Sequence, residues 1–344
     1  MTTWAVVLAG GIGSRFWPLS TPDRPKQLLP LVTGDPLLAD AVKRLRPITD
    51  PQHVLILTNT GLRQAVQALV PDVPKENVIG EPRAGGTAAA LVWAAQEIMR
   101  RDGPDAVMIS VHADWAVGDP KGFVDTLKAA AGHAAKLKSL VTVGVVPDRP
   151  DPGFGYIEPG DEIAPGAKRV KRFVEKPDRE KAAQLIKAGC LWNSGIFVWR
   201  VGDFLDDVRR LTPEIAPALH AHADDIHGFF RDITPISVDV GVLERSNRVV
   251  VLPGDFQWDD VGTWGSLQRI RAGDRSGNAM SGPAYAVEAR DNVVHSEGTT
   301  VVLYGVDKLV VVAKDGLVLV TTTDRSSDLK TLIEQLPSGV VKGP

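Results

Sequence analysis

The first half of the chain alternates between continuous apolar runs and segments in which apolar positions recur three or four residues apart. Continuous runs are typical of strands that are buried on both faces of a parallel sheet. They cover residues 4–9, 53–58, 106–111 and 140–146. Helical spacing is found in the segments 36–46, 62–69, 86–101 and 121–137. The alternation predicts an α/β fold with an open sheet and helices on both of its faces.

The pattern changes beyond Arg271, where glycine- and serine-rich turns separate short β segments. These segments are 293–295, 300–304, 309–313 and 317–321, and a final helix is predicted over 326–336. We therefore predict two domains, a large α/β domain over residues 1–272 and a small β domain with a terminal helix over residues 273–344.

Composition narrows the class of protein. The net charge of −3 over 344 residues argues against a nucleic-acid binder, which normally carries a basic excess. The single cysteine excludes an intramolecular disulfide and fits a reducing compartment. No run approaches the ~18 apolar residues of a membrane span, and the run at 4–9 is too short for the core of a signal peptide. We expect a cytoplasmic protein that contacts neither membrane nor nucleic acid.

A glycine-rich stretch follows the first predicted strand, with glycines at Gly10, Gly11 and Gly13. Glycine lets the backbone approach a ligand closely, so that peptide N–H groups can point at phosphate oxygens. Two cations, Arg15 and Lys26, come next, and a guanidinium with an ammonium suits a polyphosphate. The alternative is a glycine-rich connection with surface charges. The upstream strand and the cations argue against it.

Spacing excludes two common phosphate-binding loops. The chain has no GxxxxGK[ST] sequence, so a Walker-type loop is absent. A dinucleotide fingerprint needs a glycine at position 16, where Phe16 stands.

Residues 8–31, which read LAGGIGSRFWPLSTPDRPKQLLPL, resemble the signature of the sugar-nucleotide pyrophosphorylases. The version with FWPLS at 16–20 and PKQ at 25–27 is similar to that of the mannose-1-phosphate guanylyltransferases. Such enzymes join a sugar 1-phosphate to a nucleoside triphosphate and release pyrophosphate. The resemblance implies a Rossmann-like nucleotidyltransferase domain with a mixed, mainly parallel sheet. It also implies a small C-terminal β domain like the short left-handed β-helix that this family uses in assembly.

Nucleotide-binding residues are implied in two segments. The first supplies Leu8, Ala9, Gly10, Gly11, Gly13 and Ser14, and the second supplies Glu81, Gly86 and Thr87. The second segment corresponds to a family sequence that usually reads EPxxRNTA. Here Gly85 and Gly86 replace the arginine and the asparagine, which leaves recognition of the base and ribose open. The alternative for this segment is a helix N-terminus with Gly86 or Thr87 near the cap.

A metal site is implied at two aspartates. Asp114 follows the strand at 106–111, and a hard carboxylate oxygen there suits an Mg²⁺ ion that carries a triphosphate. The resemblance adds Asp260, in the sequence WDDVGTW at 258–264, as the second ligand. His112 and Trp115 depart from the family pattern around Asp114. A turn or cap residue is the alternative for Asp114, and an exposed, solvent-screened turn is the alternative for Asp260.

Three further motifs match the sugar-binding half of the family, in the family's order. They are GFGYIE at 153–158, FVEKP at 173–177 and LWNSGIF at 191–197. Each alone could be merely structural. The resemblance implies sugar-phosphate binding by Gly155, Glu175, Lys176 and Asn193, with Lys176 as the cation for the phosphate. A fourth motif, SVDVGVLE at 237–244, receives no role.

The resemblance thus implies an Mg²⁺-dependent enzyme that uses GTP and mannose 1-phosphate and has Arg15, Lys26, Asp114 and Asp260 as catalytic residues. It also implies a homodimer. Longer relatives add an isomerase domain, for which a chain that ends at Pro344 has no room. Two alternatives stay open: the same chemistry on another sugar 1-phosphate, such as a heptose, or another nucleotide, and a regulatory homologue that binds the nucleotide sugar without making it.

Overall fold

The computed structural model describes residues 1–11 and 14–341, and of Ser14 and Ser338 it describes only the backbone. The chain forms two compact units, each assembled from three segments. Unit 1 comprises Met1–Gly10, Ala41–Ala113 and Asp119–Gln257. Unit 2 comprises Gly11–Asp40, Asp114–Gly118 and Trp258–Pro344. The domain boundary that the sequence predicts after Ala272 stays a prediction.

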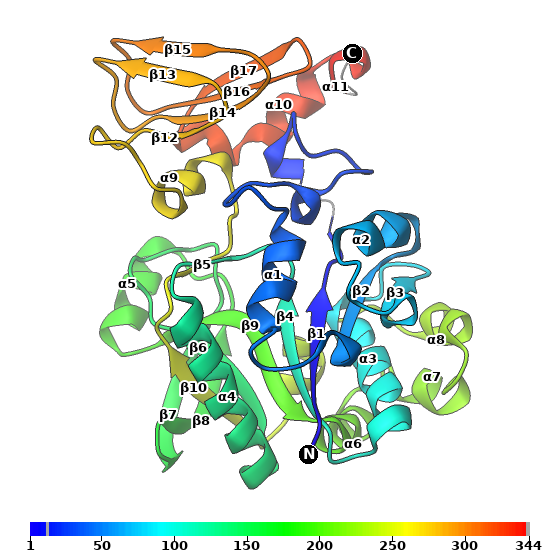
Figure 1. The fold of residues 1–344 in the computed structure, drawn as a ribbon. Helices are drawn as coiled ribbons and strands as arrows, with labels where there is room; N and C mark the ends of the chain where they lie inside the picture. The colour runs from blue at the N-terminus through cyan, green and yellow to red at the C-terminus, as the bar shows by residue number, and fades with distance from the viewer. Residues whose placement is uncertain (12–13, 342–344) are drawn as a thin grey trace. The chain divides into compact units, whose positions relative to one another are not determined.

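Unit 1 is built on one nine-stranded sheet with the order β3-β2-β1-β4-β9-β6-β10-β8-β7 (Figure 1). Its strands are β1 (Thr3–Leu8), β2 (Val54–Asn59), β3 (Val78–Glu81), β4 (Val107–His112), β6 (Leu140–Val145), β7 (Tyr156–Ala164), β8 (Ala167–Val174), β9 (Leu191–Arg200) and β10 (Val249–Gly254). Strands β1 to β4 pair in parallel, as do β6 and β10, while β9 runs antiparallel to both β4 and β6. The predicted mixed, mainly parallel sheet is therefore confirmed.

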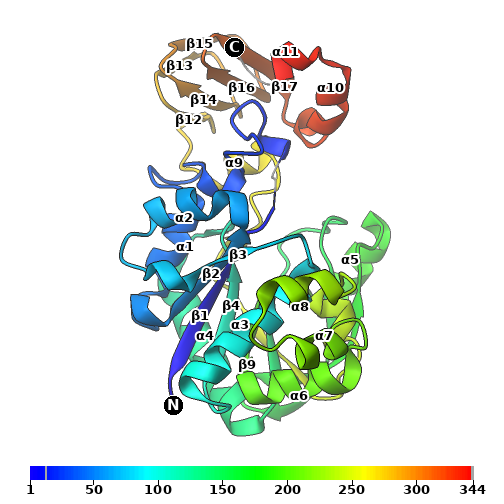
Figure 2. The ribbon, with the colours of Figure 1, turned by 90° about the vertical axis from the view of Figure 1, so that its right-hand side faces the viewer.

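Helices cover both faces of this sheet (Figure 2). They are α2 (Arg63–Leu69), α3 (Gly86–Asp102), α4 (Pro120–Leu137), α5 (Arg179–Lys187), α6 (Val201–Leu211), α7 (Ala216–Ala221) and α8 (Ile226–Asp232), and α1 (Leu37–Leu45) runs from unit 2 into unit 1. In β1, Trp4 and Val6 belong to the core cluster that includes α3, α6 and α8. The intervening Ala5 and Val7, also buried, face the other side. Strands buried on both faces explain the continuous apolar runs of the sequence.

The chain passes from unit 1 to unit 2 just after the carboxyl ends of β1 and β4, which are neighbouring strands in the middle of the sheet. Leu8 and His112 are partners in the parallel pairing of β1 with β4, and the N–H of Ala113 donates to the carbonyl of Leu8 over 2.9 Å. β1 lies between β2 and β4, so the strand order reverses here, at the carboxyl ends where open α/β sheets bind their ligands. The glycine-rich stretch and the segment with Asp114 both start from this edge.

The C-terminal part of unit 2 is a coil of β-strands. Strands β12 (Ala279–Ser281), β14 (Val293–Glu297) and β16 (Leu309–Lys314) pair in parallel, and so do β13 (Ala284–Val287) and β15 (Val301–Tyr304). Successive strands thus alternate between two parallel sheets, as in a β-helix, and its handedness stays a prediction. β17 (Leu317–Thr322) closes the coil by pairing antiparallel with β16. The final helix α10 (Leu329–Gln335) begins later than predicted, because residues 324–327 form a 3-10 turn, and α11 (Ser338–Val341) follows it.

Three further short elements of unit 2 follow Asp114 or flank Asp260 in the chain. They are β5 (Ala116–Val117), β11 (Trp258–Asp259) and α9 (Leu267–Ile270). Their core joins Phe16 and Leu19 to Trp264, Val310 and Leu319. Within residues 1–11 and 14–341, no helix has the length and apolar character that crossing a membrane requires.

Candidate active site

Lys26 connects the two predicted metal ligands in unit 2. Its ammonium Nζ donates to Oδ2 of Asp114 over 3.0 Å and to the backbone carbonyl of Asp260 over 2.6 Å. Lys26 is only 7% exposed, so these contacts are made largely out of water. Asp114 and Asp260 lie 88 and 234 positions from Lys26 in the chain, yet oxygens of both converge on one cation. We call these three residues the lysine cluster.

A short antiparallel ladder brings the two aspartates together. β5 pairs with β11, with Ala116 opposite Asp259 and Val117 opposite Trp258. Trp115 is buried and meets Trp258 edge to face, with ring centroids 5.8 Å apart. The departure from the family pattern at Trp115 therefore has a packing role next to Asp114.

Asp259, beside Asp260, has its own partners. Its Oδ2 accepts from the Arg269 guanidinium over 2.7 Å, and its Oδ1 accepts from the N–H of Val261 over 2.9 Å. Arg269 offsets the repulsion expected between adjacent carboxylates. Val261 has φ of +48°, a left-handed conformation that is rare for a β-branched residue and costs about 1–3 kcal/mol. The loop that carries Asp260 is thus held in a strained shape by Asp259.

The donor set of the lysine cluster fits Mg²⁺. No group of three or more His, Cys, Asp or Glu side chains that could hold a metal occurs in the described part of the chain. Mg²⁺ does not need one, because it usually binds one or two carboxylates and completes its shell with waters and substrate phosphates. One carboxylate oxygen of Asp114 and the backbone carbonyl oxygen of Asp260, both hard ligands, already converge on the charge of Lys26.

The glycine-rich stretch is held from within unit 2. Gln27 is buried and its Nε2 donates to the carbonyl of Gly11 over 3.3 Å. Arg15 is exposed in a 3-10 turn (Ser14–Phe16), while the next residue, Phe16, is fully buried. Phe16 thus anchors the turn from which Arg15 extends. The predicted contact of Gly13 lies outside the described residues, as does that of the Ser14 side chain.

Unit 1 supplies the start of the glycine-rich stretch and the half-buried carboxyl group of Glu81. Ala9 donates its N–H to the carbonyl of Leu57 over 2.8 Å, so this N–H serves the sheet. At the end of β3, Oε1 of Glu81 lies 3.9 Å from the point where a side chain on Gly10 would begin. Burial raises the pKa of Glu81 to about 7. A carboxyl group that changes between its neutral and charged forms near pH 7 thus lies beside Gly10.

The N-terminus of α3 explains the two glycines that replace Arg and Asn. A Cβ on Gly86, whose φ is +80°, would overlap the carbonyl oxygen of Ile236. A Cβ on Gly85 would lie 2.8 Å from Cδ1 of Ile233. Oγ1 of Thr87 accepts from the N–H of Val238 over 3.0 Å. The glycines therefore permit a close approach between the helix end and residues 233–238.

The four predicted sugar-phosphate residues lie together in unit 1. The N–H of Asn193 donates to the carbonyl of Gly155 over 2.8 Å. A Cβ on Gly155 would lie 2.9 Å from Oε2 of Glu175 and 3.6 Å from Cβ of Asn193. Nζ of Lys176 is 3.2 Å from Oε1 of Glu175. The motifs at 153–158, 173–177 and 191–197, which are separate in the sequence, thus form one group of polar residues.

Asp239, which the sequence analysis left without a role, completes this group. Its Oδ1 accepts from Nδ2 of Asn193 over 2.7 Å. The motif at 237–244 was visible in the sequence, but its partner 46 positions away was not. We call Gly155, Glu175, Lys176, Asn193 and Asp239 the asparagine cluster.

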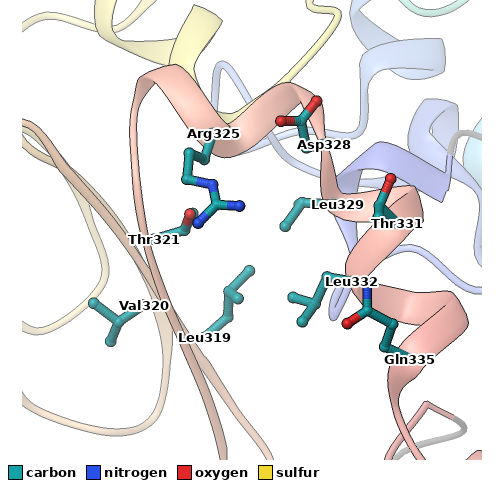
Figure 3. A pocket seen from close by; sticks show the side chains of 9 residues that line it. All are labelled: Leu319, Val320, Thr321, Arg325, Asp328, Leu329, Thr331, Leu332 and Gln335. Atoms are coloured by element: carbon teal, nitrogen blue, oxygen red, sulfur yellow. The ribbon is translucent and has the colours of Figure 1, made fainter.

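A pocket of about 330 Å³ lies elsewhere in unit 2, on β17 and α10 (Figure 3). Leu329 and Leu332 of α10 point into it toward Leu319 of β17. Arg325 and Asp328 form its polar rim. Among the described residues that line it, none belongs to the lysine cluster or the asparagine cluster.

Known proteins resemble the chain over nearly its whole length. The family model described as Nucleotidyl transferase matches residues 4–277. The Mannose-1-phosphate guanylyltransferase of Escherichia coli is 33% identical over 347 residues, which cover 96% of this chain and 73% of that protein. Mannose-1-phosphate guanylyltransferase ManC of Salmonella typhimurium is 34% identical and covers 97% and 73%. A crystal structure from Thermus thermophilus, described as a mannose-1-phosphate geranyltransferase, is 31% identical, covers 97% and 99%, and superposes with a TM-score of 0.90.

Proposed function

Because the chain belongs to the nucleotidyl transferase family, within its mannose-1-phosphate guanylyltransferase branch, we propose that it transfers GMP from GTP to mannose 1-phosphate. A phosphate oxygen of mannose 1-phosphate attacks the α-phosphorus of GTP in line, the bond to the β-phosphate oxygen breaks, and pyrophosphate leaves with that electron pair. The products are GDP-mannose and pyrophosphate. The observation that carries the proposal is the lysine cluster, in which Lys26 meets Asp114 and Asp260.

The protein contributes positioning and charge, since phosphoryl groups need no covalent partner on the enzyme. We assign Lys26 and Arg15 to the triphosphate. Lys176 is assigned to the phosphate of the sugar, and Glu175 with Asn193 to its hydroxyl groups, because a carboxylate accepts and an amide both accepts and donates. Mg²⁺, when bound to Asp114 and Asp260, would supply charge neutralisation on the phosphates.

Glu81 supports guanine as the base. The Watson–Crick edge of guanine presents two adjacent donors, N1–H and the 2-amino group, and a carboxylate can accept from both. Uracil, thymine and adenine lack this pair of donors. Glu81 lies beside Gly10 at the start of the glycine-rich stretch, where a bound nucleotide is expected.

The test is pyrophosphate release from a matrix of nucleoside triphosphates and sugar 1-phosphates in the presence of Mg²⁺. We expect GTP with mannose 1-phosphate to give the highest kcat/KM. ITP, which lacks only the 2-amino donor, is the matched control for the base. A clear preference for dTTP or UTP with glucose 1-phosphate, or for a heptose 1-phosphate, would replace the proposed pair. Binding of GDP-mannose without turnover of any pair would favour the regulatory homologue. A cytoplasmic location and a homodimer also stay predictions from the sequence.

A further inference from the structure

Asn193 is held at both ends of its amide group. Its Nδ2 donates to Oδ1 of Asp239 over 2.7 Å, and its Oδ1 accepts from the N–H of Gly195 over 3.3 Å. An asparagine amide has two N–H donors and one oxygen with two lone pairs, so these contacts leave one donor and one acceptor position. Among the described residues no further hydrogen bond takes these two positions, so they can serve a ligand in a fixed arrangement.

The backbone around Asn193 is shaped for this arrangement. β9 bulges between the pairs Val143 with Ile196 and Gly144 with Asn193, and Gly195 in the bulge has φ of +71°. Ser194 secures the bulge by donating its hydroxyl to the carbonyl of Val143 over 2.5 Å. Bulges of this kind redirect a side chain next to active sites.

Asp239 is itself firmly placed. It begins a π-helical turn (Asp239–Leu243), an irregularity found often at functional sites. The preceding residue, Val238, is fully buried and donates its N–H to Thr87 over 3.0 Å. Within the turn, the carbonyl of Gly241 accepts from the hydroxyl of Thr212 over 2.8 Å. The carboxylate therefore meets Asn193 from a rigid support.

We propose that Asp239 is a positioning residue that sets the orientation of the Asn193 amide for binding the sugar 1-phosphate. An ionised carboxylate only accepts hydrogen bonds, so it requires the NH₂ end of the amide to face it. Without Asp239 only the long contact of 3.3 Å from the N–H of Gly195 opposes a turn of the amide by about 180°, which would exchange its donor and acceptor positions. A sugar whose hydroxyl groups match one arrangement would then meet both. The inference rests on the proposed role of Asn193 in sugar binding.

The experiment compares Asp239→Ala, Asp239→Asn and Asn193→Ala in steady-state kinetics. We expect Asp239→Ala to raise KM for mannose 1-phosphate about tenfold, because an Asn193 side chain without its anchor must be immobilised again when the sugar binds. KM for GTP should change by less than about twofold, since Asn193 is assigned to the sugar. Asp239→Asn can still accept from Asn193 and should give an intermediate KM. The double variant Asp239→Ala/Asn193→Ala should be no worse than Asn193→Ala, because Asp239 acts through Asn193.

A second readout is discrimination between mannose 1-phosphate and glucose 1-phosphate, which differ in the configuration at one hydroxyl group. The ratio of their kcat/KM values should fall in Asp239→Ala and partly recover in Asp239→Asn. Asp161→Asn is the control, since it removes an acidic charge from an exposed position of β7. It should leave both KM values unchanged.

Three results obtained with the variants of Asp239 would overturn the proposal: equal effects of Asp239→Ala on both KM values, additive losses in the double variant, or an Asp239→Asn variant as impaired as Asp239→Ala. An unchanged KM in Asn193→Ala would remove Asn193 from the sugar site, and the inference with it. If wild-type protein prefers another sugar 1-phosphate, the proposed function fails, but the same comparison with that sugar still decides the role of Asp239. If no pair is turned over, calorimetric Kd values for mannose 1-phosphate replace KM.

Discussion

In the lysine cluster a buried cation holds two acidic residues, whereas in the asparagine cluster a carboxylate holds a neutral amide. In the lysine cluster the positive charge of Lys26 meets the carboxylate of Asp114 and the backbone carbonyl of Asp260. The contacts of Asn193 with Asp239 and Gly195 fix the direction of a neutral amide dipole. Charge attraction is strong but poorly directional, while an amide discriminates by the direction of its donors and acceptors. The difference suggests that the lysine cluster serves charge on phosphates and the asparagine cluster serves recognition of hydroxyl groups.

The largest expected effect comes from the aspartates of the lysine cluster. Asp114→Asn and Asp260→Asn should each lower kcat on the order of 10²-fold or more, if the bound metal stabilises several kcal/mol of transition-state charge. The double variant should be little worse, as for residues that act as a unit. Initial rates at saturating GTP, mannose 1-phosphate and Mg²⁺ provide the measurement, and Asp206→Asn at the exposed surface is the control. Additive losses would argue against a shared ion.

These two variants should also differ in stability. Asp114 meets Lys26 through its carboxylate, whereas Asp260 does so through its backbone carbonyl, which the Asn variant keeps. Asp114→Asn should therefore lower the melting temperature of the metal-free protein more than Asp260→Asn. Equal melting temperatures would mean that the contact of Lys26 with Asp114 contributes little to the folded state.

Lys176 is the basic member of the asparagine cluster, and a variant of it tests whether that cluster also binds phosphate. Lys176→Gln should raise KM for mannose 1-phosphate on the order of 30-fold, because a hydrogen bond between charged groups contributes about 1.5–3 kcal/mol. KM for GTP should change far less. An equal effect on both substrates, or none, would show that Lys176 is only a solvated charge at the end of β8.

A smaller effect, which depends on pH, is expected from Glu81 on the KM for GTP. Its pKa of about 7 means that the unliganded protein carries a protonated Glu81 at lower pH, and a protonated carboxyl has lost one acceptor for the guanine donors. KM for GTP should therefore rise as pH falls through 7, by about tenfold between about pH 8 and pH 6. Glu81→Gln should abolish this dependence, and KM for mannose 1-phosphate is the internal control. A flat profile in wild type would separate Glu81 from the base.

The smallest expected effects come from a matched pair of glycines, one beside each cluster. A Cβ on Gly262 would lie 2.8 Å from Oδ2 of Asp260, and one on Gly155 would lie 2.9 Å from Oε2 of Glu175. In each variant the carboxylate must shift by a few tenths of an ångström. Gly262→Ala should lower kcat and Gly155→Ala should raise KM for mannose 1-phosphate, each by about fivefold.

Gly132→Ala, in an open position of α4, is the control for both glycine variants and should retain full activity. If Gly262→Ala raised KM for the sugar while Gly155→Ala lowered kcat, the division of tasks between the two clusters would be wrong.

Much of unit 1 was predictable because its strands are buried on both faces and its helices on one. The four predicted strands and the four predicted helices lie within one residue of their observed bounds. Burial makes apolar residues recur at regular positions along the sequence, and this pattern can be recognised in a single sequence.

Residue pairs that only the tertiary structure brings together leave no such regular pattern in the sequence. The ion pair of Asp259 with Arg269 and the hydrogen bond of Asp239 to Asn193 follow from the β5–β11 ladder and the π-helical turn. Gly85 and Gly86 looked like lost recognition residues, although their environment shows a steric requirement set by residues 233–238. Spacing along the chain predicts which face a residue occupies but not which distant side chain it meets.

The core of unit 2 also determines when the protein can finish folding during synthesis. Trp17 donates its indole N–H to the carbonyl of Val341, which lies 324 positions later, and its own carbonyl accepts from Trp264. Until Trp264 and Val341 have left the ribosome, Trp17 lacks its two hydrogen-bond partners. Contacts of such sequence separation are slow to form, and early segments wait with apolar surface exposed. Truncated chains should therefore bury the sheet of unit 1 first and form the contacts of Trp17 only when Trp264 and Val341 are both present.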